Sequence, residues 1–154
     1  MTKVLYGPRL GKEGELRLGC SAAIFDDHGR ILLTRRMDNG QWCLPGGRME
    51  AGETAAEACE REVLEETGLS VRVKRLVGVY SHSDQLVIYP DGHKAQIVAL
   101  HFEVEVTGGK LGLSNETTDF GYYTIQEVKG MDMIGRHKER VFDTLENHPQ
   151  ALIK

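Results

Sequence analysis

Three glutamates, Glu62, Glu65 and Glu66, stand at positions i, i+3 and i+4, so in a helix their carboxylates would share one face within a single turn. Like charges at this spacing repel by about 0.2–0.5 kcal/mol per pair, and the C-terminal end of a helix favours cations instead. A solvated acidic face would not explain this placement, whereas a bound cation would turn the repulsion into ligation. Since neither histidine nor cysteine stands beside these oxygen ligands, the group indicates Mg²⁺, with Mn²⁺ as a substitute, rather than Zn²⁺.

The segment around these glutamates has clear signals for the start and the end of a helix. Thr54 followed three residues later by Glu57 is typical of a capping box, and Gly68 suits the left-handed position after a helix. We therefore predict a helix over residues 55–67. Its apolar positions form a narrow stripe that would face the core: Ala56, Cys59 and Val63.

The stretch from Gly47 to Leu69 resembles the signature box of the Nudix hydrolases. That box reads Gly, five residues, Glu, seven residues, Arg-Glu-apolar-x-Glu-Glu-x-Gly-apolar. The chain matches it without departure, through Gly47, Glu53, Arg61, Glu62, Val63, Glu65, Glu66, Gly68 and Leu69. The match covers 23 of the 154 residues, but its motif is highly specific.

The resemblance implies a role for each residue of the box. Glu62, Glu65 and Glu66 would hold the metal ions, and either Glu65 or Glu66 would take the proton from the attacking water. Arg61 would orient a box carboxylate through a charge-assisted pair. Glu53 would brace the loop or support an outer metal ion. Gly47 and Gly68 would support the backbone, and in related proteins the carbonyl of the glycine that matches Gly46 joins the metal shell.

Nudix enzymes commonly supply one further carboxylate from a loop that faces the box helix. In this chain the matching pattern is Glu116-Thr117-Thr118-Asp119, ahead of a short strand through Tyr122 and Tyr123. We expect Glu116 to reach the metal cluster, as an extra ligand or as the base for water. Asp119 is the alternative if the loop has a different register.

Candidate substrate contacts lie just before the box. Arg35 and Arg36 end a predicted strand, where alternation places them on opposite faces, so one would reach substrate phosphates and the other would be solvated. Trp42 would stack on a nucleobase or pack in the core. The Pro45-Gly46-Gly47 turn would let the backbone approach a ligand closely.

Length and composition describe an ordinary soluble protein. The chain of 154 residues has 40% hydrophobic and 27% charged residues, which predicts a single domain over 1–154, with residues 1–16 as an irregular arm containing one short strand. No apolar run approaches the roughly 20 residues needed to span a membrane, and no signal peptide is evident. Three cysteines without a Cys-x-x-Cys pair favour a reducing cytoplasm. The net charge of −4, without a basic cluster, argues against long nucleic acids and favours a small nucleotide as the partner; a homodimer remains open.

The remaining pattern predicts strands around one central helix and a second long helix near the end. A hairpin is expected from Arg17–Phe25 and Arg30–Arg36, and strands from Val71–Tyr80, Gln85–Tyr89 and Lys94 onward. In the last of these, alternating apolar residues predict one buried and one polar face. A short helix should begin after Thr124, and a final helix should run from about Met133 to His148. The resemblance sharpens this α/β pattern to the Nudix-type α/β/α sandwich, with a curved mixed sheet between helices.

The resemblance implies hydrolysis of a nucleoside diphosphate linked to another group: a nucleotide, an oxidised nucleotide, ADP-ribose or a sugar nucleotide. Loose markers for ADP-ribose or dinucleoside polyphosphates are absent, because Asp84 and Gln85, then Leu86 and Val87, occupy their positions. Two other functions remain as alternatives. A nucleotide-sensing binding module would tolerate loss of the carboxylates, and an isoprenoid-diphosphate isomerase would need a cysteine such as Cys43 in its pocket.

Overall fold

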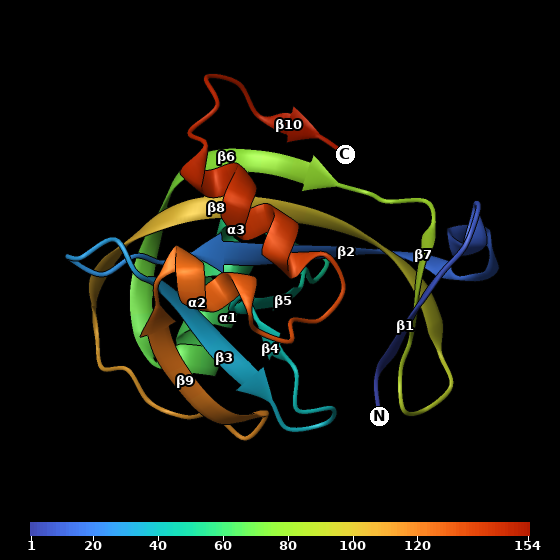
Figure 1. Cartoon of the computed structure of the whole chain (residues 1–154), viewed down its shortest axis with the longest axis horizontal. Helices are drawn as coiled ribbons and strands as arrows, with labels where there is room; N and C mark the ends of the chain where they lie inside the picture. Colours follow the sequence, from blue (N-terminus) through green and yellow to red (C-terminus); the bar gives the residue numbers. More distant parts are fainter.

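The structure is a computed structural model that describes all 154 residues. It is an α/β fold with a large mixed sheet, a small sheet and few helices (Figure 1), which confirms the predicted fold class. The strands are β1 (Lys3–Tyr6), β2 (Glu15–Ala23), β3 (Ile31–Arg36), β4 (Trp42–Cys43), β5 (Gly46–Arg48), β6 (Leu69–Tyr80), β7 (Gln85–Ile88), β8 (Lys94–Gly109), β9 (Thr117–Tyr123) and β10 (Leu152–Ile153). The helices are η1 (Leu10–Glu13, a 3₁₀ helix), α1 (Ala55–Thr67), α2 (Ile125–Lys129) and α3 (His137–Leu145). None of them is long and apolar enough to cross a membrane.

Helix α1 has the predicted bounds. The Thr54 side chain accepts a hydrogen bond from the backbone N–H of Glu57 at 3.2 Å, which satisfies one of the free donors at the start of the helix. Gly68 ends the helix with a φ of 79°, and a Cβ there would lie 2.2 Å from the carbonyl oxygen of Lys110. Because any side chain would both strain this backbone and collide with the next loop, only glycine fits.

The large sheet has the strand order β1-β7-β8-β2-β5, and β6 pairs with both β8 and β10. Its centre is the parallel pair β2 and β8, in register from Glu15 with Ala95 to Ala23 with Glu103. The small sheet has the order β4-β3-β9. Helix α1 covers one face of the large sheet, and α3 lies across the other (Figure 1).

The predicted hairpin of residues 17–36 was wrong in its pairing. Strands β2 and β3 belong to different sheets, and only the turn between them is shared, through an isolated bridge of Phe25 with Ile31. Strand β2 pairs instead with β8 and β5, and β3 with β4 and β9. A run of consecutive buried residues ends β2 and begins β3, so each strand packs on both faces and the chain can pass from one sheet to the other.

The predicted polar face of β8 was also wrong. Ala99 and His101 are 2% and 0% exposed, because α3 covers the face on which they lie. His101 is held between Ser21 Oγ at 2.8 Å and Thr144 Oγ1 at 2.9 Å. On the opposite face Phe102 and Val104 pack in the cluster below α1 as predicted. Alternation located both faces, but it could not show that the second one would be covered.

The final helix is shorter than predicted. Helix α3 spans His137–Leu145, and the residues before it form an irregular segment. In this segment Met133 packs in the core cluster that contains Val141 of α3, and Ile134 lines the cavity described below. Arg140, Val141, Asp143 and Thr144 are its buried residues. The helix therefore turns polar side chains toward the sheet, where they contact polar residues of its strands: Ser21, Tyr80 and His101.

Candidate active site

The three glutamates of α1 line one open cavity of roughly 900 Å³ between the helix, strands of both sheets and the start of α3. Glu116, from the loop before β9, lines the same cavity. The helix supplies its three carboxylates from one face, as their spacing predicted. The loop brings the fourth because Glu116 is fixed through its backbone, whose carbonyl accepts a 3.0 Å hydrogen bond from the N–H of Met37.

Glu66 is the most enclosed of these carboxylates. One of its oxygens accepts a hydrogen bond from the Thr34 hydroxyl at 3.0 Å, and the other accepts one from the backbone N–H of Gly46 at 3.3 Å. Burial raises the pKa of Glu66 to about 7, and the negative charges of Glu62 and Glu116 add to the rise. A cation bound among these carboxylates would offset the charges of Glu62 and Glu116 that raise the pKa of Glu66.

Glu62 lies against the backbone of the turn that precedes the helix. A Cβ at Gly47 would lie 2.4 Å from the carboxyl carbon of Glu62, so glycine at this position creates the space for the carboxylate. Burial raises the pKa of Glu62, the charges of Glu65 and Glu116 raise it further, and Arg61 opposes the rise. The backbone of the turn and the helix carboxylate thus fit each other closely.

Arg61 joins the box loop to the helix. Its Nε and Nη2 donate to the two carboxylate oxygens of Glu53 at 2.6 and 2.9 Å, and Nη2 also donates to the carbonyl of Arg48 at 3.0 Å. Its Nη1 reaches Glu62 at 2.9 Å and Glu65 at 3.2 Å. One guanidinium therefore positions two candidate metal ligands, while the bidentate pair holds the loop against the helix.

The other predicted site residues fall into two groups. Arg36 lines the cavity and pairs with Asp38 at 3.0 Å, and Gly46 lines it beside Glu66. Arg35 is exposed and donates to the carbonyl of Gly40 at 2.8 Å, outside the cavity wall. Trp42 is also absent from that wall and packs edge-on against Tyr123 with ring centroids 5.2 Å apart. The structure thus places Arg36 in the cavity wall and Arg35 outside it, and it packs Trp42 against Tyr123.

The donor set of the cavity fits a hard divalent cation. Four glutamates line it, and Arg61 is the only residue that forms ion pairs with any of them. Carboxylate oxygens are the ligands that Mg²⁺ and Mn²⁺ prefer, and no histidine or cysteine sulfur competes among the helix carboxylates. Glu62, Glu65 and Glu66 are therefore the residues that would hold such an ion, with Glu116 facing them.

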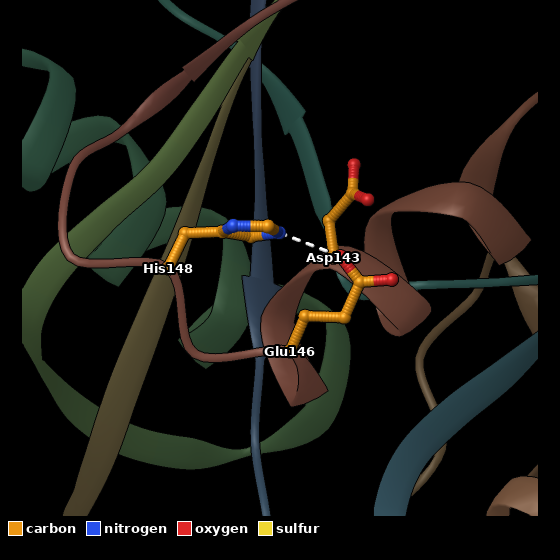
Figure 2. Close-up of side chains that lie close together, drawn as sticks. All are labelled: Asp143, Glu146 and His148. Carbon is orange, nitrogen blue, oxygen red and sulfur yellow. Dashed lines mark hydrogen bonds and ion pairs between the residues drawn. The ribbon is translucent and has the colours of Figure 1, made fainter.

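A second acidic group lies at the end of α3 and does not fit a metal site as well. Asp143, Glu146 and His148 offer ligand atoms within 4.8 Å of one another (Figure 2). Their acceptors are already engaged: Asp143 accepts from the Tyr80 hydroxyl at 2.8 Å and pairs with Lys154 at 3.1 Å, and His148 pairs with Glu146 at 2.6 Å. None of the three lines the cavity. These contacts fasten the end of the chain to α3.

Several cavity residues were not predicted from the sequence. The wall also includes Thr2, Arg17, Tyr89, His137 and Arg140. Thr2 belongs to the N-terminal arm, which β1 fastens to β7, and its hydroxyl contacts Asp38. Arg17 lies over the ring of Tyr89 at 4.9 Å. Thr2, Arg17 and Tyr89 are brought to the cavity by the pairing of β1, β2, β7 and β8, whereas His137 and Arg140 reach it from α3. These long-range contacts leave no pattern in the sequence that would have indicated the residues.

Cys43 lies in the cavity wall as a buried thiol. It is 5% exposed, and its sulfur is 3.4 Å from the Thr34 hydroxyl oxygen. Burial raises the pKa of Cys43 to about 11, and the charge of Glu66 acts in the same direction. The reactive form of a cysteine is the thiolate, so this thiol is poorly placed to act as a nucleophile.

Comparison with known proteins shows the family. A family model described as the NUDIX domain matches residues 15–145, and the chain belongs to the Nudix family. It is 39% identical over 108 residues to a MutT-like protein of Streptomyces ambofaciens, which covers 70% of this chain and 64% of that one. It is 37% identical over 108 residues to an ADP-ribose pyrophosphatase of Methanocaldococcus jannaschii, covering 68% and 60%. The chain thus spans less than two thirds of the length of these relatives.

Solved structures agree on the fold. An ADP-ribose pyrophosphatase from Streptococcus suis has a TM-score of 0.72 at 23% identity, over 90% of this chain and 98% of that one. A MutT protein from Methanosarcina mazei has a TM-score of 0.67 at 26% identity, over 86% and 94%. Both comparisons support the Nudix architecture described above.

Proposed function

We propose that this protein is a metal-dependent pyrophosphohydrolase that cleaves the diphosphate bridge of a nucleoside diphosphate linked to another group. The observation that carries the proposal is the single cavity lined by Glu62, Glu65, Glu66 and Glu116, with Arg36 in the same wall. Four glutamates gathered at one cavity disfavour an anionic substrate unless a cation joins them. The proposal therefore requires metal ions and substrate to occupy the cavity together.

In this proposal Glu62, Glu65 and Glu66 hold Mg²⁺, with Mn²⁺ as a substitute. When bound, the metal neutralises charge on the phosphate oxygens and on the attacking and leaving oxygens. Arg61 holds Glu62 and Glu65 in place from outside the cavity. Arg36 offers a guanidinium to phosphate oxygens from the same cavity wall.

The attacking water needs a carboxylate to take its proton. Glu116 forms no hydrogen bond through its side chain in the structure, is exposed to the cavity, and is close enough to affect the pKa values of Glu62 and Glu66. These features suit a base that is not committed to structural contacts. We therefore place Glu116 in this role ahead of Glu65 and Glu66.

The names of relatives support the substrate class at a coarse level. One is an ADP-ribose pyrophosphatase, and others are a putative 8-oxo-dGTP diphosphatase of Bacillus subtilis and an 8-oxo-dGDP phosphatase of Homo sapiens. All three names describe a nucleotide with a diphosphate linkage. A small nucleotide is therefore the proposed partner, and the three buried free thiols support a reducing cytoplasm as the location.

Water labelled with ¹⁸O distinguishes hydrolysis from isomerisation. Hydrolysis by water is expected to place one ¹⁸O atom on a phosphate product, which mass spectrometry detects. Cys43→Ser is expected to keep the rate within about threefold, because the buried thiol takes no part in the chemistry. A product without label, or a folded but inactive Cys43→Ser variant, would instead favour thiol chemistry and the isomerase alternative.

A further inference from the structure

Arg140 is a buried cation without a carboxylate partner. Its side chain projects from α3 toward the large sheet and is 6% exposed, yet it lines the cavity that holds the candidate metal ligands. The acidic residues near it in α3, Glu139 and Asp143, both pair with Lys154 instead. A buried charge that lacks a partner is destabilising, so this arrangement needs a compensating contact.

The protein uses only part of the hydrogen-bonding capacity of Arg140. Nη1 donates to Ser21 Oγ at 3.3 Å, and the guanidinium lies over the Tyr80 ring at 5.4 Å. Nε is buried and has no partner. A guanidinium carries five N–H donors and no acceptor, so most of its donors remain free. Because Nε is enclosed by protein, a ligand in the cavity can reach only the terminal nitrogens of Arg140, and it must present acceptors to them.

His137 contributes a second donor to the same part of the cavity. Its Nδ1 accepts a 3.0 Å hydrogen bond from the backbone N–H of Leu44, so this nitrogen carries no proton. A neutral imidazole then has its proton on Nε2, which is a donor. His137 lines the cavity together with Arg140, Leu44 and Ile134. The cavity wall around Arg140 and His137 thus combines two donors with apolar side chains.

These features fit the aromatic ring of a nucleobase that carries an oxo group. Apolar side chains suit the faces of a flat ring, whereas a phosphate group would require more cations than this part of the cavity wall supplies. An arginine binds the O6 and N7 acceptors of a 6-oxopurine in bidentate fashion, but the 6-amino group of adenine would place a donor against a donor. Gln85 also lines the cavity, and its amide oxygen has no partner. Because an amide offers both a donor and an acceptor, Gln85 could bind a 6-oxo or a 6-amino group and does not distinguish the two bases.

We propose that Arg140, supported by His137, selects nucleotides with a 6-oxopurine base over those with adenine. The inference rests on the proposed function, since it places the base of the substrate beside Arg140 and His137 and its diphosphate at the box glutamates. It makes Arg140 a specificity-determining residue, distinct from the carboxylates that carry the chemistry.

Binding of a matched pair of analogues tests this inference without turnover. The α,β-methylene diphosphates of inosine and adenosine cannot be hydrolysed at that bridge and differ only at the six-position edge of the purine. Isothermal titration with Mg²⁺ is expected to give at least about tenfold tighter binding for the inosine analogue, in the range of one good base contact. Arg140→Met, which keeps the volume and removes the donors, should reduce the preference to less than about threefold.

Two further variants make the result specific to Arg140. Arg136→Met removes an arginine one turn earlier that pairs with Asp84 outside the cavity, and it should keep the full preference. Arg140→Lys keeps the charge without the planar fork and should retain only part of it. Replacement of a buried charge by an apolar residue is often tolerated, and thermal melting checks that Arg140→Met is folded.

Equal or tighter binding of the adenosine analogue by the wild type would overturn the inference. So would an equal loss of affinity for both analogues in Arg140→Met, which would assign Arg140 to the phosphates. Failure of the proposed function looks different: no nucleotide would be hydrolysed, whatever the preference in binding. Turnover of nucleotides without any base preference would contradict only the inference.

Discussion

Glu66→Gln is expected to lower kcat by at least about 10²-fold at saturating Mg²⁺ while the fold is retained. The change keeps the size of the side chain but removes a negative charge from the wall of the cavity. One oxygen remains to accept from Thr34, which holds the side chain in place. Glu66 is also held by the backbone N–H of Gly46, so the variant should stay in place in the cavity wall. The loss of activity should therefore come from the missing charge and not from a disturbed structure. Steady-state kinetics over a Mg²⁺ titration measures it.

The matched control is Glu57→Gln on the same helix. Glu57 is exposed in the first turn, outside the cavity, so this variant removes the same charge without touching the site and should keep full activity. Glu62→Gln and Glu65→Gln should also lose activity, because Arg61 holds both toward the proposed metal. Full Mg²⁺-dependent turnover in folded Glu66→Gln would remove that residue from the essential set.

Glu116→Gln is expected to lower kcat by about 10²–10⁴-fold, the range for removal of a general base. The side chain lines the cavity and makes no hydrogen bond within the protein, so its loss should leave the melting temperature nearly unchanged. A loss of rate without a loss of stability is the combination that a structural role would not give. Kinetics at saturating substrate and Mg²⁺, together with thermal melting, measure both.

Asp119→Asn is the control for this loop. Asp119 is exposed, accepts a hydrogen bond from the N–H of Phe120 at 2.8 Å, and does not line the cavity. Its replacement should leave kcat unchanged. Loss of activity in Asp119→Asn with an active Glu116→Gln would show that the loop takes the other register during catalysis.

The sequence predicted the parts of the site that are encoded locally. The spacing of Glu62, Glu65 and Glu66 determines their common face in any helix, and Thr54 and Gly68 mark its ends because each satisfies a local backbone requirement. The resemblance implied that Arg61 orients a box carboxylate without saying which one, and in the structure Arg61 pairs with Glu53 of the preceding loop.

Contacts between distant segments could not be predicted in this way. The assignment of β2 and β3 to different sheets depends on the parallel pairing of β2 with β8, which a hairpin turn at residues 26–29 does not reveal. His137 and Arg140 are polar residues that helical periodicity would assign to solvent, and they turn inward only because α3 covers the second face of the sheet. The part of the cavity wall that His137 and Arg140 form therefore depends on tertiary packing.

Metal-dependent turnover of a nucleotide panel tests the central claim most directly. The panel should contain ADP-ribose, 8-oxo-dGTP, a guanosine sugar nucleotide and matched inosine and adenosine diphosphate compounds, each assayed with EDTA and after Mg²⁺ is restored. Cleavage of at least one diphosphate bridge is expected with Mg²⁺, with loss of activity in EDTA and recovery on adding the metal. Absence of cleavage for every compound with Mg²⁺ or Mn²⁺, or undiminished cleavage in EDTA, would contradict the account.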